Sequence, residues 1–87
     1  MTDDYAALFG KKLAEIRAEK GISQDKLALK CGVARSFIGD VERGKRNLTL
    51  KNIIKLSVGL KVLTSDLLAL VDEEVSKADT HTDTNSD

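Results

Sequence analysis

Apolar residues recur at intervals of three and four along most of the chain, which is the period of amphipathic helices. Capping residues and glycines divide this pattern into separate segments. The predicted helices span residues 5–20, 24–31, 34–42, 50–60 and 65–71. Proline, which would break a helix, is absent from the sequence. The pattern therefore predicts an all-α fold.

The first predicted helix, residues 5–20, has a simple pattern. Phe9, Leu13 and Ile16 form its buried stripe. Gly21 follows as a stop signal. We expect this helix to lie behind the segment that comes next and to support it.

Residues 23–46 hold two short predicted helices joined by a tight turn. Ser23 is a favourable N-cap for the first helix. Gly32 permits the positive φ that an abrupt end of a helix requires. The second helix ends at Gly44, and the inward positions around it are Val33, Phe37, Ile38 and Val41. The outward positions are Arg35, Ser36, Gly39, Asp40 and Arg43, followed by Lys45, Arg46 and Asn47.

A polar helix face flanked by cations has the chemistry that a DNA major groove accepts. The groove is about 12 Å wide and admits one α-helix. Cations at the helix ends suit phosphates, and Arg, Ser and Asn side chains suit base edges. An ordinary surface helix of a bundle is also polar outside, so the pattern favours DNA binding but leaves that alternative open.

Two residues of the second short helix depart from what a stable helix requires. Ala34 stands where an N-cap is expected, and Ala there costs about 1 kcal/mol relative to Ser or Thr. Gly39 costs about 1 kcal/mol relative to Ala inside a helix. We expect the helix either to begin at a different residue or to be completed by DNA. The missing side chain at Gly39 would let DNA come close.

The last two predicted helices hold more apolar residues than one buried face needs. Thr49 and Thr64 are their predicted N-caps. The expected core stripe is Leu50, Ile53, Leu56 and Leu60. The apolar residues expected in an exposed patch are Ile54, Val58, Leu63, Leu67, Leu68 and Val71. Such a patch favours a homodimer, and the alternative is a monomer with an apolar surface.

The net charge is zero, which on its own argues against nucleic acid. The distribution of charge changes the picture. Residues 5–71 hold 13 Lys and Arg against 6 acids, whereas residues 72–87 hold one Lys and six acids. The sequence therefore predicts a flexible N-terminus over 1–4, a basic folded domain over 5–71 and an acidic, disordered tail over 72–87.

Catalytic and metal-binding chemistry has little support in the sequence. Cys31 is the only cysteine, so it forms no intramolecular disulfide, and we expect it to be a buried apolar residue. His81, the only histidine, lies in the tail. We expect no enzyme activity, metal, cofactor or small-molecule ligand. The acidic N-terminus and the lack of a membrane-length apolar run predict a cytoplasmic protein.

Residues 23–46 resemble the helix-turn-helix of the Cro and lambda-repressor type, also called the XRE family. The residues that carry the resemblance are Gln24, Ala28, Gly32, Val33, Ile38, Val41, Glu42 and Gly44. The resemblance implies a compact five-helix, lambda-repressor-like domain over about residues 5–71, with the helix-turn-helix as helices 2 and 3. It also implies a structural ion pair between Arg17 and Glu42. A phosphate contact by Arg17 is the alternative, or an added role.

The outward groups of the helix-turn-helix are the predicted DNA contacts. Base-edge contacts are predicted for Arg35, Ser36, Phe37, Asp40 and Arg46. Phe37 qualifies only if it is not part of the core, and Arg46 reaches either a base or a phosphate. Asp40 either accepts from a cytosine or orients a neighbouring arginine. Contacts to the DNA backbone are predicted for Gln24, Arg43, Lys45, Asn47, Thr49 and Arg17.

The run ERGKRNLTLKNI, residues 42–53, is similar to the controller proteins of restriction-modification systems. That resemblance implies a sequence-specific, dimeric transcription regulator that acts on its own promoter and on that of the endonuclease. Its implied partners are a pseudo-palindromic operator in double-stranded DNA, a second copy of the chain and RNA polymerase; no membrane partner is expected. The alternatives are a phage-type repressor, an antitoxin or, in a different class, a protein-binding helical module.

Overall fold

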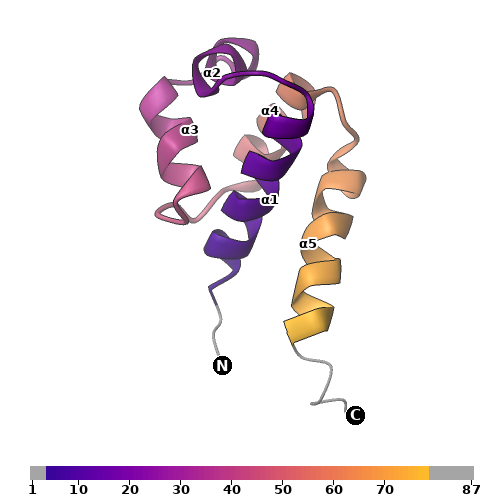
Figure 1. Cartoon of the computed structure of the whole chain (residues 1–87). Helices are drawn as coiled ribbons and strands as arrows, with labels where there is room; N and C mark the ends of the chain where they lie inside the picture. Colours follow the sequence, from indigo (N-terminus) through magenta and orange to yellow (C-terminus); the bar gives the residue numbers. More distant parts are fainter. Residues whose placement is uncertain (1–3, 79–87) are drawn as a thin grey trace.

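A computed structural model describes residues 4–78 of the chain and shows five α-helices there (Figure 1). The helices are α1 Tyr5–Glu19, α2 Gln24–Cys31, α3 Arg35–Glu42, α4 Leu50–Leu60 and α5 Thr64–Ala78. The all-α prediction is confirmed. In the part of the chain that is described, no helix is both long enough and apolar enough to span a membrane.

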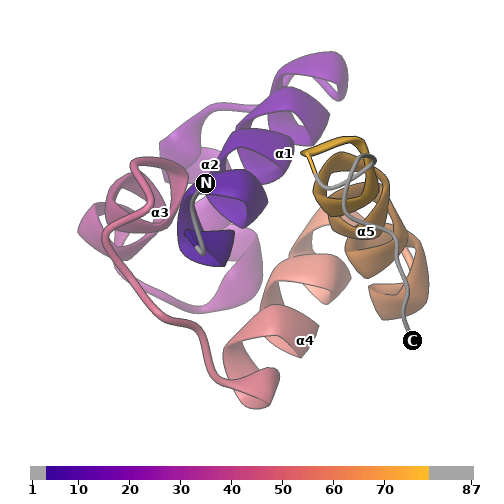
Figure 2. The same cartoon turned by 90° about the horizontal axis from the view of Figure 1, so that it is seen from below.

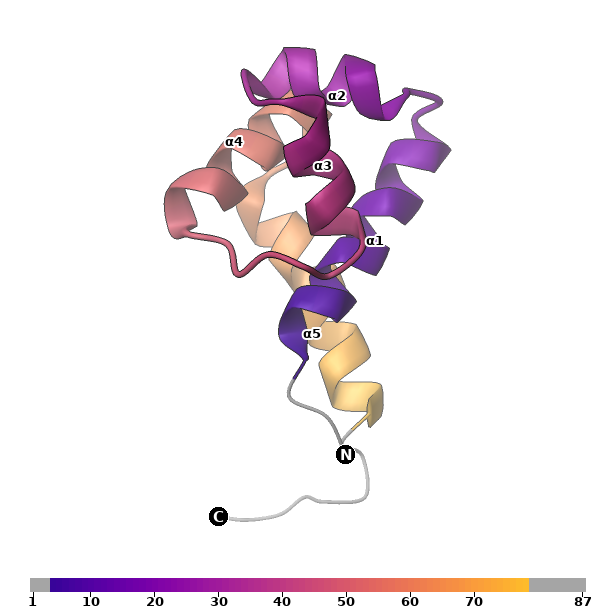
Figure 3. The ribbon, with the colours of Figure 1, turned by 90° about the vertical axis from the view of Figure 1, so that its left-hand side faces the viewer.

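Helix α1 is the centre of the arrangement. It lies between α3 on one side and α5 on the other, and it contacts both (Figures 1 and 2). Helix α2 packs across α3 and α4. Helix α3 is therefore held from behind by α1 and α2, with its remaining face turned away from the rest of the bundle (Figure 3).

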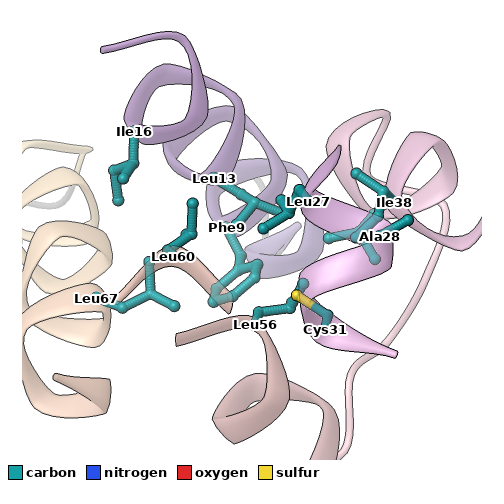
Figure 4. Packing of buried hydrophobic residues seen from close by; sticks show 11 residues of the cluster. Phe9, Leu13, Ile16, Leu27, Ala28, Cys31, Ile38, Leu56, Leu60 and Leu67 are labelled. Carbon is teal, nitrogen blue, oxygen red and sulfur yellow. The ribbon is translucent and has the colours of Figure 1, made fainter. Parts of the chain in front are cut away.

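The core is mostly aliphatic, with Phe9 as its one aromatic residue among the described residues, and every helix contributes to it. The buried apolar residues are Phe9, Leu13, Ile16, Leu27, Ala28, Cys31, Ile38, Val41, Leu56, Leu60 and Leu67. Figure 4 shows these side chains converging between the helices, with Phe9 and Leu13 of α1 among them. Each fully buried Leu or Ile stabilises the fold by about 1.5–3 kcal/mol relative to an exposed one. The predicted burial of Cys31 is confirmed, and this desolvation raises the pKa of its thiol.

Three helices begin with a side chain that satisfies a free backbone N–H group. Asp4, Ser23 and Thr49 each accept a hydrogen bond from the N–H three residues later, at 2.9, 3.0 and 3.2 Å. The caps predicted at Ser23 and Thr49 are confirmed. Asp4 was expected in a flexible terminus, but it is the N-cap of α1. The rest of that terminus, residues 1–3, lies outside the described part.

Each of the two helices of the helix-turn-helix is followed by a glycine with a positive φ. Gly32 adopts φ 71° at the end of α2, and Gly44 adopts φ 74° just after α3. A Cβ added to Gly44 would lie 2.8 Å from the Cα of Ala7. The chain leaving α3 therefore touches the backbone of α1, and this contact leaves no room for a side chain.

The predictions for the last two helices need three corrections. Leu50 is 66% exposed, because it shares a face of α4 with Ile54 and not with the buried Leu56. Thr64 does not cap α5; it is the first residue of that helix, and its hydroxyl lies 2.7 Å from the Ser57 hydroxyl.

The third correction concerns the length of α5. The helix runs to Ala78, whereas the sequence predicted an end at Val71 and a disordered tail from residue 72. No glycine or proline stands between residues 65 and 78 to stop it. The remainder of the predicted tail, including His81, lies outside the described residues.

Candidate nucleic-acid interface

Helix α3 is anchored by two fully buried side chains. Ile38 and Val41 have 0% and 1% of their surface exposed. Since they lie three residues apart, they share one face of the helix, and that face packs on α1 and α2. The opposite face of an eight-residue helix is then turned outward, as Figure 3 shows.

The N-terminus of α3 carries no side-chain cap. Ala34 occupies the N-cap position, and its carbonyl accepts from Phe37 and Ile38 at 3.0 and 3.4 Å. The helix therefore begins at Arg35, one residue later than predicted. A helix N-terminus carries a partial positive charge that attracts phosphate. The poor cap at Ala34 thus coincides with the end of the helix where an anion is favoured.

Arg35 and Ser36 are both exposed on the first turn of α3. The Nε atom of Arg35 lies 2.9 Å from Oδ1 of Asp25, which is in the first turn of α2. This ion pair was not predicted from the sequence. The residues are ten apart and meet only because the turn at Gly32 folds α3 back against α2.

A second charged cluster covers the rest of the outward face. The Asp40 carboxylate accepts a hydrogen bond from Arg43, and its other oxygen lies 3.9 Å from Nε of Arg46. The Arg46 guanidinium lies over the Phe37 ring, 4.9 Å from the centroid. Asp40 thus orients Arg43 in the free protein, which is one of the two roles considered for it. Phe37 is partly buried against the core and lies beneath Arg46, so its predicted base contact is not favoured.

Gly39 is not the open position that the sequence predicted. The residue is buried, and a Cβ added to it would lie 3.2 Å from Nη1 of Arg43. The Arg43 side chain therefore covers the space beside Gly39. DNA would reach this position only if Arg43 moved aside, for example onto a phosphate.

An ion pair joins the end of α3 to α1. Arg17 donates from Nε to Glu42 at 2.6 Å and from Nη2 at 3.1 Å, and its Nη1 donates to the Ile22 carbonyl at 2.8 Å. The hydrogen bond to Glu42 raises the pKa of Arg17. Gln24 also donates to Glu42, at 2.8 Å. The expected Arg17–Glu42 pair is present, and in this state all three Arg17 nitrogens are engaged within the protein.

Three of the other predicted backbone contacts lie just beyond α3. Lys45 and Asn47 are exposed, and the Thr49 hydroxyl is already the N-cap acceptor of α4. With Arg43 and Arg46 they belong to the segment that leads from α3 to α4, and Figure 3 shows this segment on the same side of the molecule as α3. A cationic segment placed here suits the phosphates that flank a groove.

The apolar patch differs in membership from the prediction. Ile54, Val58 and Leu63 are 44%, 66% and 67% exposed, as expected for a patch. The prediction that Leu67 lies in the exposed patch is wrong. Leu67 is 1% exposed and belongs to the core, where α5 packs on α1 and α4. Leu68 and Val71 are partly buried against the core. Leu50 belongs to the exposed set, and its four-residue spacing from Ile54 was the available signal.

The two short helices, the tight turn, the exposed outer face of α3 and the cationic segment that follows it define a helix-turn-helix protein. A helix-turn-helix family model matches residues 13–67. The chain belongs to this family, in its XRE-type branch, together with restriction-modification controller proteins.

Three relatives illustrate that similarity. The control protein C.BamHI of Bacillus amyloliquefaciens is 48% identical over 69 residues, 78% of this chain and 85% of that protein. The crystal structure of the controller protein C.AhdI from Aeromonas hydrophila has a TM-score of 0.69 and 45% identity, covering 71% of this chain and 94% of that one. The structure of the controller protein C.Esp1396I has a TM-score of 0.79 and 30% identity, with 88% and 99% covered. The chain is thus a DNA-binding transcription regulator.

Proposed function

We propose that this regulator is a sequence-specific homodimer that controls a restriction-modification system, acting on its own promoter and on that of the endonuclease. The observation that carries the proposal is the outward face of α3, where Arg35 and Ser36 stand exposed next to a cationic segment. The similarity to controller proteins along most of the chain supports the choice of system.

Helix α3 is proposed to enter the major groove with its first turn toward the bases. Arg35 suits guanine O6 and N7, where a good bidentate contact discriminates by about 1–3 kcal/mol. Ser36 suits several bases, and Arg46 reaches a base or a phosphate. Lys45 and Asn47 are assigned to the DNA backbone, as is Arg43 once it leaves Asp40.

The dimer is proposed to form through the exposed stripe of α4. Leu50, Ile54 and Val58 lie four residues apart along one face of that helix, and Leu63 follows it. A row of exposed apolar side chains along one helix face is typical of a protein–protein contact surface. A two-fold dimer would present two copies of α3 to successive major grooves, about 34 Å apart.

Selection of bound fragments from a random DNA pool tests the DNA-binding part of the proposal. We expect a pseudo-palindrome with half-sites about one helical turn apart, and copies of it upstream of this gene and of an endonuclease gene. An enriched site that lies only elsewhere would favour a phage-type repressor or an antitoxin. Weak, salt-sensitive binding without an enriched sequence would show that the protein binds DNA without sequence preference. No DNA affinity at all would favour a protein-binding module.

Sedimentation of Val58→Asp tests the dimer. Val58 is 66% exposed, so the substitution leaves the monomer fold intact while placing a charge in the proposed interface. We expect dimers for the unmodified chain and monomers for the variant. Leu29→Asp is the matched control, because Leu29 is 83% exposed and belongs to α2 and not to α4, so this variant should stay dimeric. If the Val58→Asp protein is still a dimer, the exposed stripe of α4 is not part of the interface.

A further inference from the structure

The ion pair between Asp25 and Arg35 joins the two helices of the helix-turn-helix at their outer surface. Oδ1 of Asp25 lies 2.9 Å from Nε of Arg35, and the two side chains are 76% and 65% exposed. Exposed ion pairs contribute little to folding, because water and salt screen them. Helices α2 and α3 are already joined through the fully buried Leu27 and Ile38. The stability of the fold therefore does not explain the pair.

The geometry of the contact matters for the proposed role of Arg35. A guanidinium group is a planar fork whose nitrogens are fixed relative to one another. Asp25 lies on the Nε side, so within the described residues it leaves the edge of the fork that carries Nη1 and Nη2 for another partner. That edge matches the paired acceptors O6 and N7 of guanine. A free arginine side chain would have to lose its rotamer freedom on binding, whereas Asp25 restricts it in advance.

The charge of Asp25 has a second effect on binding. Sequence-independent affinity for DNA comes from cations near the phosphates, and each neutralised phosphate adds to it. A carboxylate beside Arg35 lowers this attraction for every DNA sequence. The same contact thus favours a base-reading geometry and weakens binding that does not use it.

We propose that Asp25 is a positioning residue, which holds Arg35 for base recognition and opposes non-specific binding to phosphates. This inference rests on the proposed function, in which Arg35 contacts a base. It predicts a change in discrimination between DNA sequences, and that separates it from a purely structural role. Loss of folding would lower the affinity for all duplexes in the same proportion.

The test compares the affinity for the duplex recovered by selection with that for a scrambled duplex of the same composition, by fluorescence anisotropy. Asp25→Asn should raise the affinity for scrambled DNA and lower the ratio of the two affinities by roughly two- to five-fold, the range of an exposed ion pair. Asp25→Glu, which keeps the charge and the favourable position near the α2 N-terminus, should retain most of the ratio. The matched control is Asp66→Asn on α5, an exposed acid remote from α3, which should leave the ratio unchanged.

A double-mutant comparison with Arg35→Ala distinguishes the possible failures. In the Arg35→Ala background, Asp25→Asn should no longer change the ratio, because the side chain that it positions is absent. If Arg35→Ala lowers the ratio but Asp25→Asn does not, the positioning role is overturned and the proposed function stands. If Arg35→Ala leaves the ratio unchanged, both the base contact and the inference built on it are wrong.

Discussion

Replacing Glu42 with alanine tests how much the ion pair between Glu42 and Arg17 stabilises the packing of α3 on α1. Glu42 has 8% of its side chain exposed and accepts from Arg17 and Gln24 at distances of 2.6 to 3.1 Å. Without the carboxylate, the Arg17 side chain, which is 19% exposed, loses the opposite charge that it pairs with. Breaking a buried ion pair in this way usually costs about 3–5 kcal/mol.

The remaining exposure of Arg17 reduces that figure, because water reaches part of the guanidinium. We expect Glu42→Ala to lower the free energy of unfolding by about 2–4 kcal/mol. A chain of 87 residues has a total stability of about 4–13 kcal/mol, so the loss is a large share of the whole. The corresponding fall in Tm is at least about 8 °C for a domain of this size.

Urea unfolding followed by circular dichroism measures this change. Glu19→Ala is the matched control, since Glu19 is an exposed acid at the end of α1, and its removal should change stability by less than about 0.5 kcal/mol. The double variant Arg17→Met, Glu42→Leu should lose less than the sum of the single variants, because neither charge is left unpaired. A Glu42→Ala midpoint equal to that of Glu19→Ala would refute the reasoning.

Three other predictions follow from single positions. Gly10→Ala should lower the free energy of unfolding by about 3 kcal/mol in the same urea assay, because its Cβ would overlap the backbone carbonyl of Val41 where α1 meets α3. Stability should fall as pH rises above about 8.5, since the raised pKa of Cys31 lets the unfolded thiol ionise first, and Cys31→Ala should reduce that slope. Lys45→Ala should weaken binding to selected and scrambled duplexes alike and reduce the slope of log affinity against log salt by about 1.

The starts of α2 and α4 and the turn at Gly32 were predictable because their signals are local. Ser23 and Thr49 are caps that act within three residues, and Gly32 is the residue type that accepts a positive φ. These features depend on the backbone next to them and not on the tertiary fold. The length of α5 was missed because the polar, acidic residues after Val71 were read as disordered, although no glycine or proline stops the helix before Ala78.

The allocation of apolar residues to core or surface was less predictable, since it depends on which neighbour covers each face. Leu50 lies three residues from Ile53 and four from Ile54, so both faces of α4 were available to it by periodicity. Contact of α4 with α2 and α5 decides the matter, and Leu50 stays exposed. Gly10 is a similar case. A side chain there would overlap the backbone of Val41 in α3, which is far along the chain.

The same distinction separates the residues that fix α3 from those that the proposed site would use. The contacts behind α3, through Ile38, Val41 and Glu42, are buried, so substitutions there act on folding first. The ion pairs on its outer face, such as Asp25 with Arg35, are exposed and contribute little to stability. Substitutions on that face can therefore change which DNA sequence is bound while the domain stays folded.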